Sequence, residues 1–320
     1  MNKYTKKVSV IVPVYNAGKT LARLLGNLLH QTLSDMEVIL IDDCSTDGSA
    51  NIMQDAKEQF PDKVILLKND TNSGPGASRN KGIEAASGEY IGFADADDMV
   101  DVSMYEKLYD EAVRTEADLL DCAHALGADA EDVVIQISEE RRGKASWKTK
   151  SDMIAAGGYV WSKLYSHSMI DRYHIRFNST YILEDTSFMM LSLYHARILS
   201  GVDDVLYVYM NTPDSLSKNK SSYEYIQAAM NAVGDIFEKM SALPEYDKVQ
   251  MAVERIITWL LINSYRMAER MDNSNSDTVR SLLSSLMRVT VSFPLEKNPY
   301  IIYGISDDDK KVLRELTSLR

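Results

Sequence analysis

The sequence has no apolar run long enough to cross a bilayer. A transmembrane helix needs about 20 consecutive apolar residues, and the longest later run, residues 256–262, is far shorter. Residues 8–14 follow a basic N-terminus, but Ser9 and Pro13 interrupt them and no convincing cleavage site follows, unlike a signal peptide. The sequence therefore predicts a cytoplasmic protein that is neither exported nor integral to a membrane. Peripheral contact with the inner face of a membrane stays open.

Basic residues and cysteines are also scarce. The 35 Lys and Arg residues are outnumbered by 47 Asp and Glu residues, the net charge is −12 and the pI is about 5.0. Nucleic-acid-binding proteins carry a basic surface, so this balance argues against a nucleic-acid partner. Cys44 and Cys122 have no metal-like spacing, which predicts reduced thiols. The histidines likewise lack metal-ligand spacing.

Two phosphate-binding motifs are missing. The first strand is not followed by G-x-G-x-x-G, and no G-x-x-x-x-G-K-[ST] occurs, so neither a dinucleotide fold nor a P-loop is predicted. With 320 residues and 45% hydrophobic content, the chain can nevertheless bury a sizeable core, as one large domain or two smaller ones.

The first hundred residues alternate between strand and helix patterns. Dense β-branched runs predict strands, and leucines at helical spacing predict amphipathic helices between them. Strands are predicted at residues 8–14, 37–41, 64–67 and after Gly88, and helices at 19–32, 50–59 and 77–86. Short connections in this order indicate an α/β fold with a parallel sheet.

Further strands and helices are predicted up to residue 210, and the pattern becomes helical after residue 211. Further strands are predicted at 118–122, 133–137 and 205–210, and helices at 102–115 and 183–196. A polar linker at 217–222 precedes apolar stripes that predict helices near 226–240, 249–260 and 279–286. We therefore predict a catalytic domain at residues 1–215 and a helical C-terminal region at 216–320.

Three carboxylates follow the apolar strand at residues 90–93. Asp95, Asp97 and Asp98 would raise each other's pKa unless a cation neutralised them, and oxygen ligands suit Mg²⁺ or Mn²⁺. The alternative is that Asp97 or Asp98 caps the helix predicted from residue 102. Capping explains only one of the three carboxylates.

A second acidic turn, at Asp42 and Asp43, follows another predicted strand. Because α/β proteins bind ligands at the carboxyl ends of parallel strands, we expect the two acidic turns to lie near each other. Arg79 could contact phosphate or a base, and a solvated surface arginine is the alternative.

Taken together, these segments resemble the family 2 glycosyltransferases of the GT-A fold, which combine a nucleotide-binding mixed sheet with flanking helices. The order and spacing of the motifs match throughout the first hundred residues. The segments that carry the resemblance are residues 8–16, 41–49, 74–82, 93–98, 161–164, 176–177 and 184–188. The family often has glycine at the position of Cys44.

The resemblance implies roles on the donor side. Asp43 would hydrogen-bond the uracil of a UDP-sugar, in a base pocket lined by Pro13 and Tyr15 with Arg79 nearby. Asp95, with Ala96 beside it, would meet the ribose or the sugar. Asp97 would ligate Mn²⁺ or Mg²⁺ on the diphosphate. These expectations make a nucleotide-sugar the donor and a divalent metal the cofactor.

The acceptor side is implied by the later motifs. Asp185 would be the general base that deprotonates the acceptor hydroxyl, giving inversion at the anomeric carbon. The alternative is that Glu184 and Asp185 merely begin a helix. Trp161, Lys163 and Glu184 are acceptor-side candidates, although Trp161 is equally compatible with a core position.

The predicted activity is transfer of a single sugar to a glycan, lipid-linked or protein-linked hydroxyl in bacterial-type surface polysaccharide or glycoconjugate synthesis. The motif Q-x-x-R-W of processive synthases in this family is absent. Alternatives are a nucleotidyltransferase of similar fold, for which residues 16–19 form too short a loop, and a non-catalytic sugar-nucleotide-binding subunit. The C-terminal helices could also form a homo-oligomer.

Overall fold

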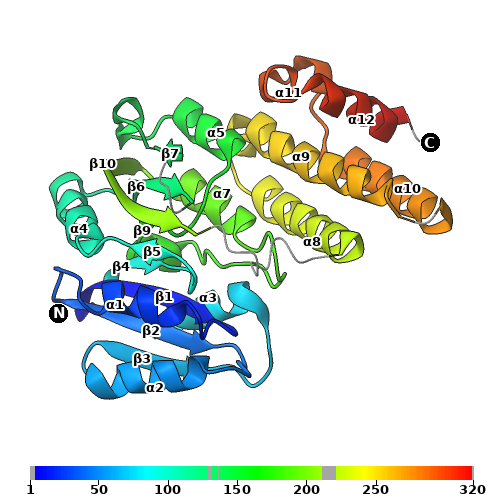
Figure 1. The fold of residues 1–320 in the computed structure, drawn as a ribbon. Coiled ribbons are helices and arrows are strands. Elements are labelled where there is room, and N and C mark those ends of the chain that lie inside the picture. Colours follow the sequence, from blue (N-terminus) through cyan, green and yellow to red (C-terminus); the bar gives the residue numbers. More distant parts are fainter. Residues whose placement is uncertain (1–3, 128–131, 136, 211–220, 272, 319–320) are drawn as a thin grey trace. The chain divides into compact units, whose positions relative to one another are not determined.

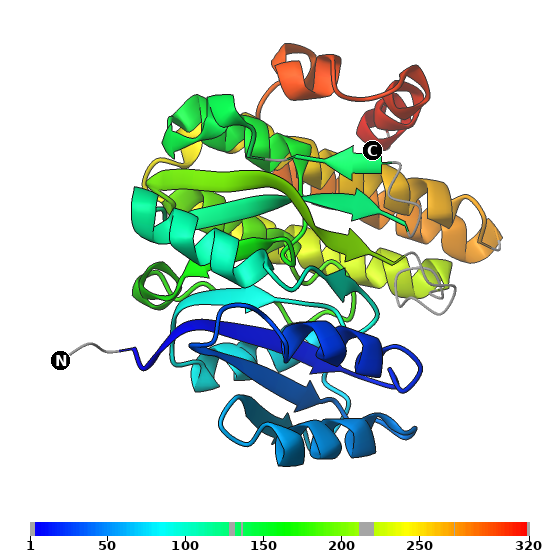
Figure 2. The ribbon, with the colours of Figure 1, turned by 60° about the vertical axis from the view of Figure 1, so that its left-hand side comes forward.

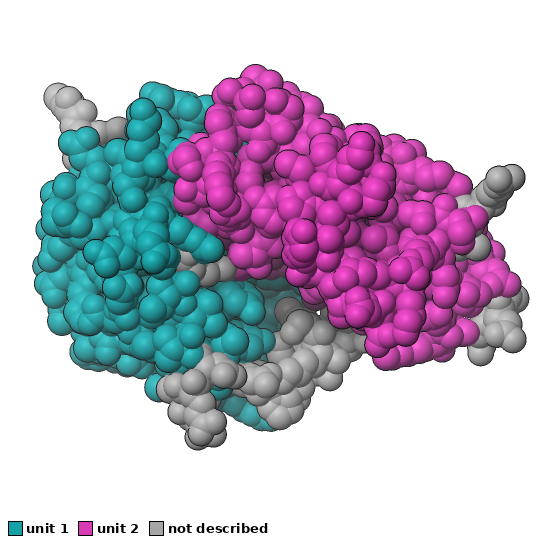
Figure 3. Space-filling model, turned by 90° about the horizontal axis from the view of Figure 1, so that it is seen from above, with its two compact units in different colours: residues 1–145, 159–181, 192–213 teal, residues 146–158, 182–191, 214–320 magenta. Residues whose placement is uncertain are grey.

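The computed structural model describes residues 4–127, 132–135, 137–210, 221–271 and 273–318. The chain divides into two compact units (Figure 3). Unit 1 comprises residues 1–145, 159–181 and 192–213, and unit 2 comprises residues 146–158, 182–191 and 214–320. The sequence places the domain boundary after residue 215, whereas the structure also assigns two earlier segments to the second unit. Most of the predicted linker at 217–222 lies outside the described residues.

The sheet of unit 1 begins with four parallel strands in the order β3-β2-β1-β4 (Figure 1). They are β1 (Lys6–Val14), β2 (Met36–Asp42), β3 (Val64–Lys68) and β4 (Gly88–Phe93). All four predicted strands are present. Every residue of β2 is buried, as expected for a strand covered on both faces of a parallel sheet.

Helices connect these strands: α1 (Leu21–Leu28), α2 (Ser49–Gln59) and α3 (Gly74–Ala85). Helix α1 buries Leu21, Leu24, Leu25 and Leu28, the stripe that predicts it. Helix α3 approaches β1 closely at Gly82, where an added Cβ would collide with the side chain of Ile11.

The second half of the sheet has a mixed topology that continues β9-β6-β10-β5 from β4. Its strands are β5 (Met99–Val100), β6 (Leu119–Leu126), β7 (Asp132–Val134), β8 (Gly143–Lys144), β9 (Lys163–Ser166) and β10 (Ile198–Tyr209). The predicted strand at 133–137 corresponds to β7, which pairs antiparallel with β6 at the margin of the sheet. Strand β9 is antiparallel to both β4 and β6, and was not predicted.

Helix α4 (Met104–Thr115) packs against β6, β9 and β10, and Figure 2 shows it lying across these strands. Because β5 lies between Asp98 and α4, neither Asp97 nor Asp98 caps this helix, and that alternative is wrong. The short helices η1 (Glu139–Arg141) and α6 (His167–Arg172) complete the unit. The apolar core under α1 and α4 includes Val10, Leu24, Leu40, Leu108 and Leu164.

Unit 2 is built from helices. They are α5 (Trp147–Ala156), α8 (Ser222–Ser241), η2 (Tyr246–Lys248), α9 (Gln250–Ala268), α10 (Asn273–Thr290), η3 (Leu295–Lys297), α11 (Pro299–Ile302) and α12 (Asp307–Ser318). The three predicted C-terminal helices correspond to α8, α9 and α10. Helix α5 packs against α9, which explains why residues 146–158 belong to this unit. Helix α7 (Thr186–His195) spans the boundary between the two units.

Among the described helices, none combines the length and the apolarity that a bilayer span requires.

Candidate active site

The carboxyl ends of three neighbouring parallel strands form the predicted ligand-binding edge of unit 1. Strand β1 lies between β2 and β4, and its register pairs Val14 with Asp42 and Ile11 with Phe93. The acidic turns after β2 and β4 therefore lie at one edge of the sheet, as predicted from the parallel order. Tyr15 follows β1 at the same edge and is 41% exposed.

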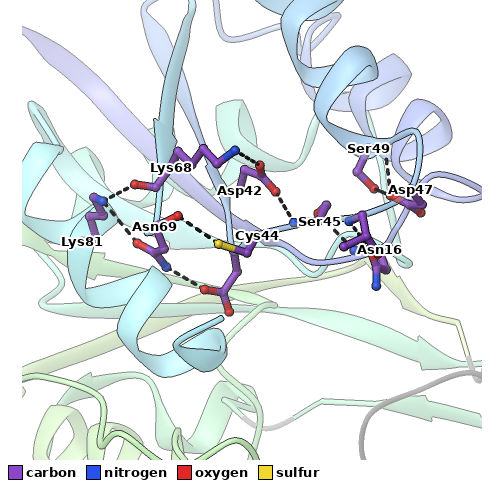
Figure 4. Close-up of polar contacts among 11 residues, drawn as sticks. Asn16, Asp42, Cys44, Ser45, Asp47, Ser49, Lys68, Asn69 and Lys81 are labelled. Carbon is purple, nitrogen blue, oxygen red and sulfur yellow. Dashed lines mark hydrogen bonds and ion pairs between the residues drawn. The ribbon is translucent and has the colours of Figure 1, made fainter. Parts of the chain in front are cut away.

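The turns after β1 and β2 are joined by short polar contacts (Figure 4). The Asn16 side-chain oxygen accepts the Thr46 N–H at 2.8 Å. The Gly18 N–H donates to Asp47 at 2.8 Å. Asn16 and Cys44 both have left-handed backbones, with φ of 49° and 63°. This conformation suits glycine, because a residue with a Cβ atom is strained at positive φ.

The Asp43 carboxylate is buried and held on both of its oxygens. Oδ1 accepts the Ser73 N–H and the Asn69 Nδ2–H, each at 2.8 Å, and Oδ2 accepts the Gly74 N–H at 2.8 Å. Among the described ion pairs, none involves Asp43. The turn that starts α3 therefore orients the residue predicted to bind the base. Pro13, the other predicted base-pocket residue, is half-buried on β1 opposite Ile41.

Arg79 lies inside the protein rather than on its surface. Its Nη2 forms a 2.7 Å ion pair with Asp95 Oδ1, and its guanidinium lies 5.3 Å from the ring centre of Phe177. Only 4% of Arg79 is exposed, so the solvated-surface alternative is wrong. The contact brings a cation from α3 to the acidic turn after β4, in a position suited to anions or polar hydroxyls.

The other two carboxylates of that turn differ in environment. Asp98 is fully buried and accepts hydrogen bonds from Tyr207 Oη and Met210 N, both at 2.7 Å. Burial first, and the nearby Asp95 second, raise the pKa of Asp98 above its ordinary range. Asp98 thus anchors the turn to β10. Asp97 is half-buried, and its carbonyl accepts from Arg23 Nη2 at 2.5 Å.

No group of three or more His, Cys, Asp or Glu side chains in the described part of the chain could hold a metal ion. Asp98 is turned into the protein and Asp95 is paired with Arg79, which explains why the three acids do not converge. A magnesium-type ion often takes only one or two carboxylates and completes its shell with substrate phosphates and water. The half-buried Asp97 meets the requirement for one such carboxylate ligand. Ala96 lies next to it in the turn.

Trp161 and Lys163, predicted on the acceptor side, are both buried. The Trp161 ring is stacked between Tyr207, at 4.4 Å, and Tyr159, at 4.7 Å, so both of its faces are covered. Lys163 Nζ lies 3.2 Å from the buried Asp121 carboxylate. These positions favour a core position for Trp161. The charge of Lys163 is paired with the buried Asp121 carboxylate inside the protein. The acceptor-side expectation for the two residues does not agree with this burial.

Glu184 and Asp185 lie in unit 2, directly before α7. The Asp185 carbonyl accepts the Met189 N–H at 2.9 Å, which is the first backbone bond of that helix. Asp185 is half-buried and Glu184 is buried. The segment therefore does begin a helix, and the role of Asp185 as a general base stays a prediction.

Two residues at this edge of the sheet were missed by sequence reasoning. Asn69 follows β3 as Asp43 follows β2, so its place at a strand end was an available signal. Tyr207 binds Asp98 through its hydroxyl and accepts the Asp95 N–H at 3.1 Å. It lies 109 residues from Asp98 in sequence, and no local pattern points to that contact.

Fold and site define an α/β protein with acidic turns at the carboxyl ends of its parallel strands. The chain belongs to glycosyl transferase family 2, whose model matches residues 9–175. The family predicted from the motifs is thus confirmed, and with it a glycosyltransferase as the enzyme class of the family.

One relative is the glycosyltransferase EpsJ of Bacillus subtilis, which is 32% identical over 218 residues. The match covers 66% of this chain and 63% of EpsJ, so the chain spans less than two thirds of that relative's length.

Two solved structures share the fold. S. aureus TarS, crystallised with UDP-GlcNAc, has a TM-score of 0.73 at 20% identity, over 97% of this chain and 88% of that one. The mannosyltransferase PcManGT from Pyrobaculum calidifontis, in complex with GDP-Man and Mn²⁺, has a TM-score of 0.55 at 17% identity, over 98% and 86%. At these identities the comparison confirms the predicted GT-A architecture and nothing more specific.

Proposed function

We propose that the protein transfers a single sugar from a UDP-sugar to a hydroxyl of a glycan, lipid-linked or protein-linked acceptor, with inversion at the anomeric carbon. The observation that carries this proposal is the meeting of Asp43, Tyr15 and the Asp95–Asp97 turn at one edge of the unit 1 sheet. Family membership supports it. Surface polysaccharide or glycoconjugate synthesis is the biological setting that we infer.

On the donor side, the chain's own residues bind and orient the nucleotide. The Asp43 carboxylate, held by the start of α3, accepts an N–H of the base, and the exposed Tyr15 ring covers a face of it. Asp95 receives a ribose or sugar hydroxyl, with Arg79 keeping its carboxylate in place. TarS was crystallised with UDP-GlcNAc, which supports a UDP donor.

Asp97 is the residue that we propose to hold Mn²⁺ or Mg²⁺, together with the donor diphosphate. When bound, such an ion offsets the negative charge that develops on the leaving nucleotide. The Mn²⁺ in the PcManGT complex supports a divalent ion in this fold.

On the acceptor side, Asp185 is the proposed general base. A carboxylate accepts the proton of the attacking hydroxyl as the bond to the anomeric carbon forms and the nucleotide leaves, which inverts the configuration in one step. The position of Asp185 at the start of a helix holds its backbone in place.

A panel of nucleotide sugars tests the activity. The protein is incubated with each donor and Mn²⁺, then with EDTA, and release of the free nucleotide is measured. We expect release from a UDP-sugar that EDTA suppresses. If no nucleotide sugar is bound or hydrolysed with the metal present, the transferase proposal fails.

Two variants separate the proposed roles. Asp97→Ala should lose metal-dependent donor binding, whereas Asp185→Ala should retain donor binding and lose transfer. Matched controls are Asp101→Asn, an exposed acid near the same turn, and Asp277→Asn, an exposed acid of unit 2. Intact transfer by Asp185→Ala would show that the base is another residue.

A further inference from the structure

The Asp43 carboxylate is nearly saturated before any ligand binds. A carboxylate has about four acceptor positions, two on each oxygen. The Ser73 N–H and the Asn69 amide fill both positions on Oδ1, and the Gly74 N–H fills one on Oδ2. Counting the hydrogen bonds of the described residues, one acceptor position remains, and it lies on Oδ2.

The bases of nucleotide sugars differ in how many N–H donors they present to a carboxylate, and therefore in how many acceptor positions they need on it. Uracil presents a single imide N–H, at N3, between two carbonyl groups. Guanine presents two adjacent donors, N1–H and N2–H, which match a carboxylate only when both oxygens are available. An unpaired buried donor weakens binding by roughly 5- to 150-fold. One open position on Oδ2 therefore suits uracil and leaves guanine with an unpaired N–H.

Asn69 cannot easily turn away to release Oδ1. Its Nδ2 also donates to Ser78 Oγ at 2.9 Å, and its Oδ1 accepts Lys81 Nζ at 3.2 Å. Its backbone N–H donates to the Asp42 carbonyl at 2.9 Å. Figure 4 shows the Asn69 side chain with Lys81 on one side and its main chain in contact with Cys44. Because the ammonium group selects the amide oxygen, the NH₂ group is directed toward Asp43.

We propose that Asn69 is a specificity-determining residue for the nucleobase, because it occupies Oδ1 of Asp43 and so selects a base with one imide N–H over guanine. This inference rests on the proposed function and adds to it. The fold itself does not select the base, since related structures hold UDP-GlcNAc and GDP-Man. Every contact involved lies within unit 1.

The test measures nucleotide binding rather than transfer. Isothermal titration calorimetry with Mn²⁺ present compares UDP, GDP and N3-methyl-UDP for the wild type and for Asn69→Ala. We expect the wild type to prefer UDP over GDP by about tenfold or more, and to lose a similar factor for N3-methyl-UDP. In Asn69→Ala, the UDP-to-GDP preference should fall about fivefold or more, because Oδ1 becomes available.

Asn80→Ala is the matched control. Asn80 lies in helix α3, and its amide exchanges hydrogen bonds with the Phe177 backbone at 2.9 and 3.0 Å rather than with Asp43. This variant should keep the wild-type preference. Asn69→Ser provides a second substitution should Asn69→Ala not fold.

The outcomes are distinguishable. Absence of binding of any nucleotide by the wild type would defeat the proposed function itself. If the wild type binds UDP but Asn69→Ala keeps the same UDP-to-GDP ratio, Asn69 is only structural and this inference is overturned. Equal binding of UDP and N3-methyl-UDP would overturn it as well, because the single imide N–H would then not be recognised.

Discussion

His124 should make the stability of unit 1 depend on pH. This residue of β6 is fully buried, and its ring lies edge-on to Trp161 at 4.7 Å and to Tyr159 at 5.6 Å. Within the described part of the chain, neither of its ring nitrogens has a hydrogen-bond partner. Burial first, and the positive charge of Lys163 second, lower the pKa of His124 from 6.5 to about 4.

The magnitude follows from the two pKa values. Above pH 6.5 the imidazole is neutral in both the folded and the unfolded chain, and its contribution to stability is complete. As the pH falls below 6.5, His124 is protonated in the unfolded chain but stays neutral in the folded chain. The free energy of unfolding therefore decreases until the pH reaches the folded-state pKa of about 4. At 1.36 kcal/mol per pKa unit, the loss is about 2 kcal/mol at pH 5 and about 3 kcal/mol at pH 4.

The assay is urea unfolding between pH 8 and pH 5, followed by the fluorescence of Trp161. The other two tryptophans, Trp147 and Trp259, belong to unit 2 and are replaced by phenylalanine so that the signal reports on unit 1. His124→Phe keeps an aromatic ring in the stack and removes the titrating group. We expect this variant to lose about 2 kcal/mol less than the parent over this pH range.

His30→Gln is the control, because His30 is an exposed histidine of the same unit. It should leave the pH dependence unchanged. If His124→Phe showed the same loss of stability as its parent on acidification, the buried neutral imidazole would not be the cause and the reasoning would be refuted.

Three further substitutions test local features by urea unfolding. Cys44→Val should destabilise by about 1–2 kcal/mol, because a β-branched residue does not suit φ of 63°, while Cys44→Gly should be tolerated. Gly82→Ala should lower the free energy of unfolding by about 1–3 kcal/mol, because the added methyl group overpacks against β1. Gly26→Ala is the control and should not lower stability, because the described chain leaves open space for the added Cβ. Glu254→Gln should lower the free energy of unfolding by about 1–3 kcal/mol, because the buried carboxylate accepts the backbone N–H groups that follow α10. The fluorescence of Trp259 reports this unfolding, and unchanged stability would contradict the role of Glu254.

The sequence predicted the first half of the sheet because its signals are local. Dense β-branched runs, such as the one in β1, and leucines at helical spacing in α1 define elements without reference to distant residues. Parallel order then places the carboxyl ends of those strands at one edge. The sequence therefore predicts that Asp43 and Asp95 lie at the same edge of the sheet, as the structure shows.

The second half of the sheet depends on pairing between distant segments. Strand β9 is short and inserts antiparallel between β4 and β6, so its residues contact partners far away in sequence. Nothing local distinguishes a side chain that faces an acceptor from one that faces the core. For that reason Lys163 was assigned to the acceptor side, while the structure pairs it with Asp121.

By itself, the sequence determined the parallel strands of the first half of the sheet, the family and the carboxylates at the sheet edge. Only the tertiary structure decided what surrounds each charge. In the folded structure, the buried Arg79 pairs with Asp95, and Asp98 accepts a hydrogen bond from Tyr207. Asn69 donates a hydrogen bond to one carboxylate oxygen of Asp43. The physical reason is that a charged group's hydrogen bonds and solvation come from whichever segments pack around it, and these segments are distant in the chain.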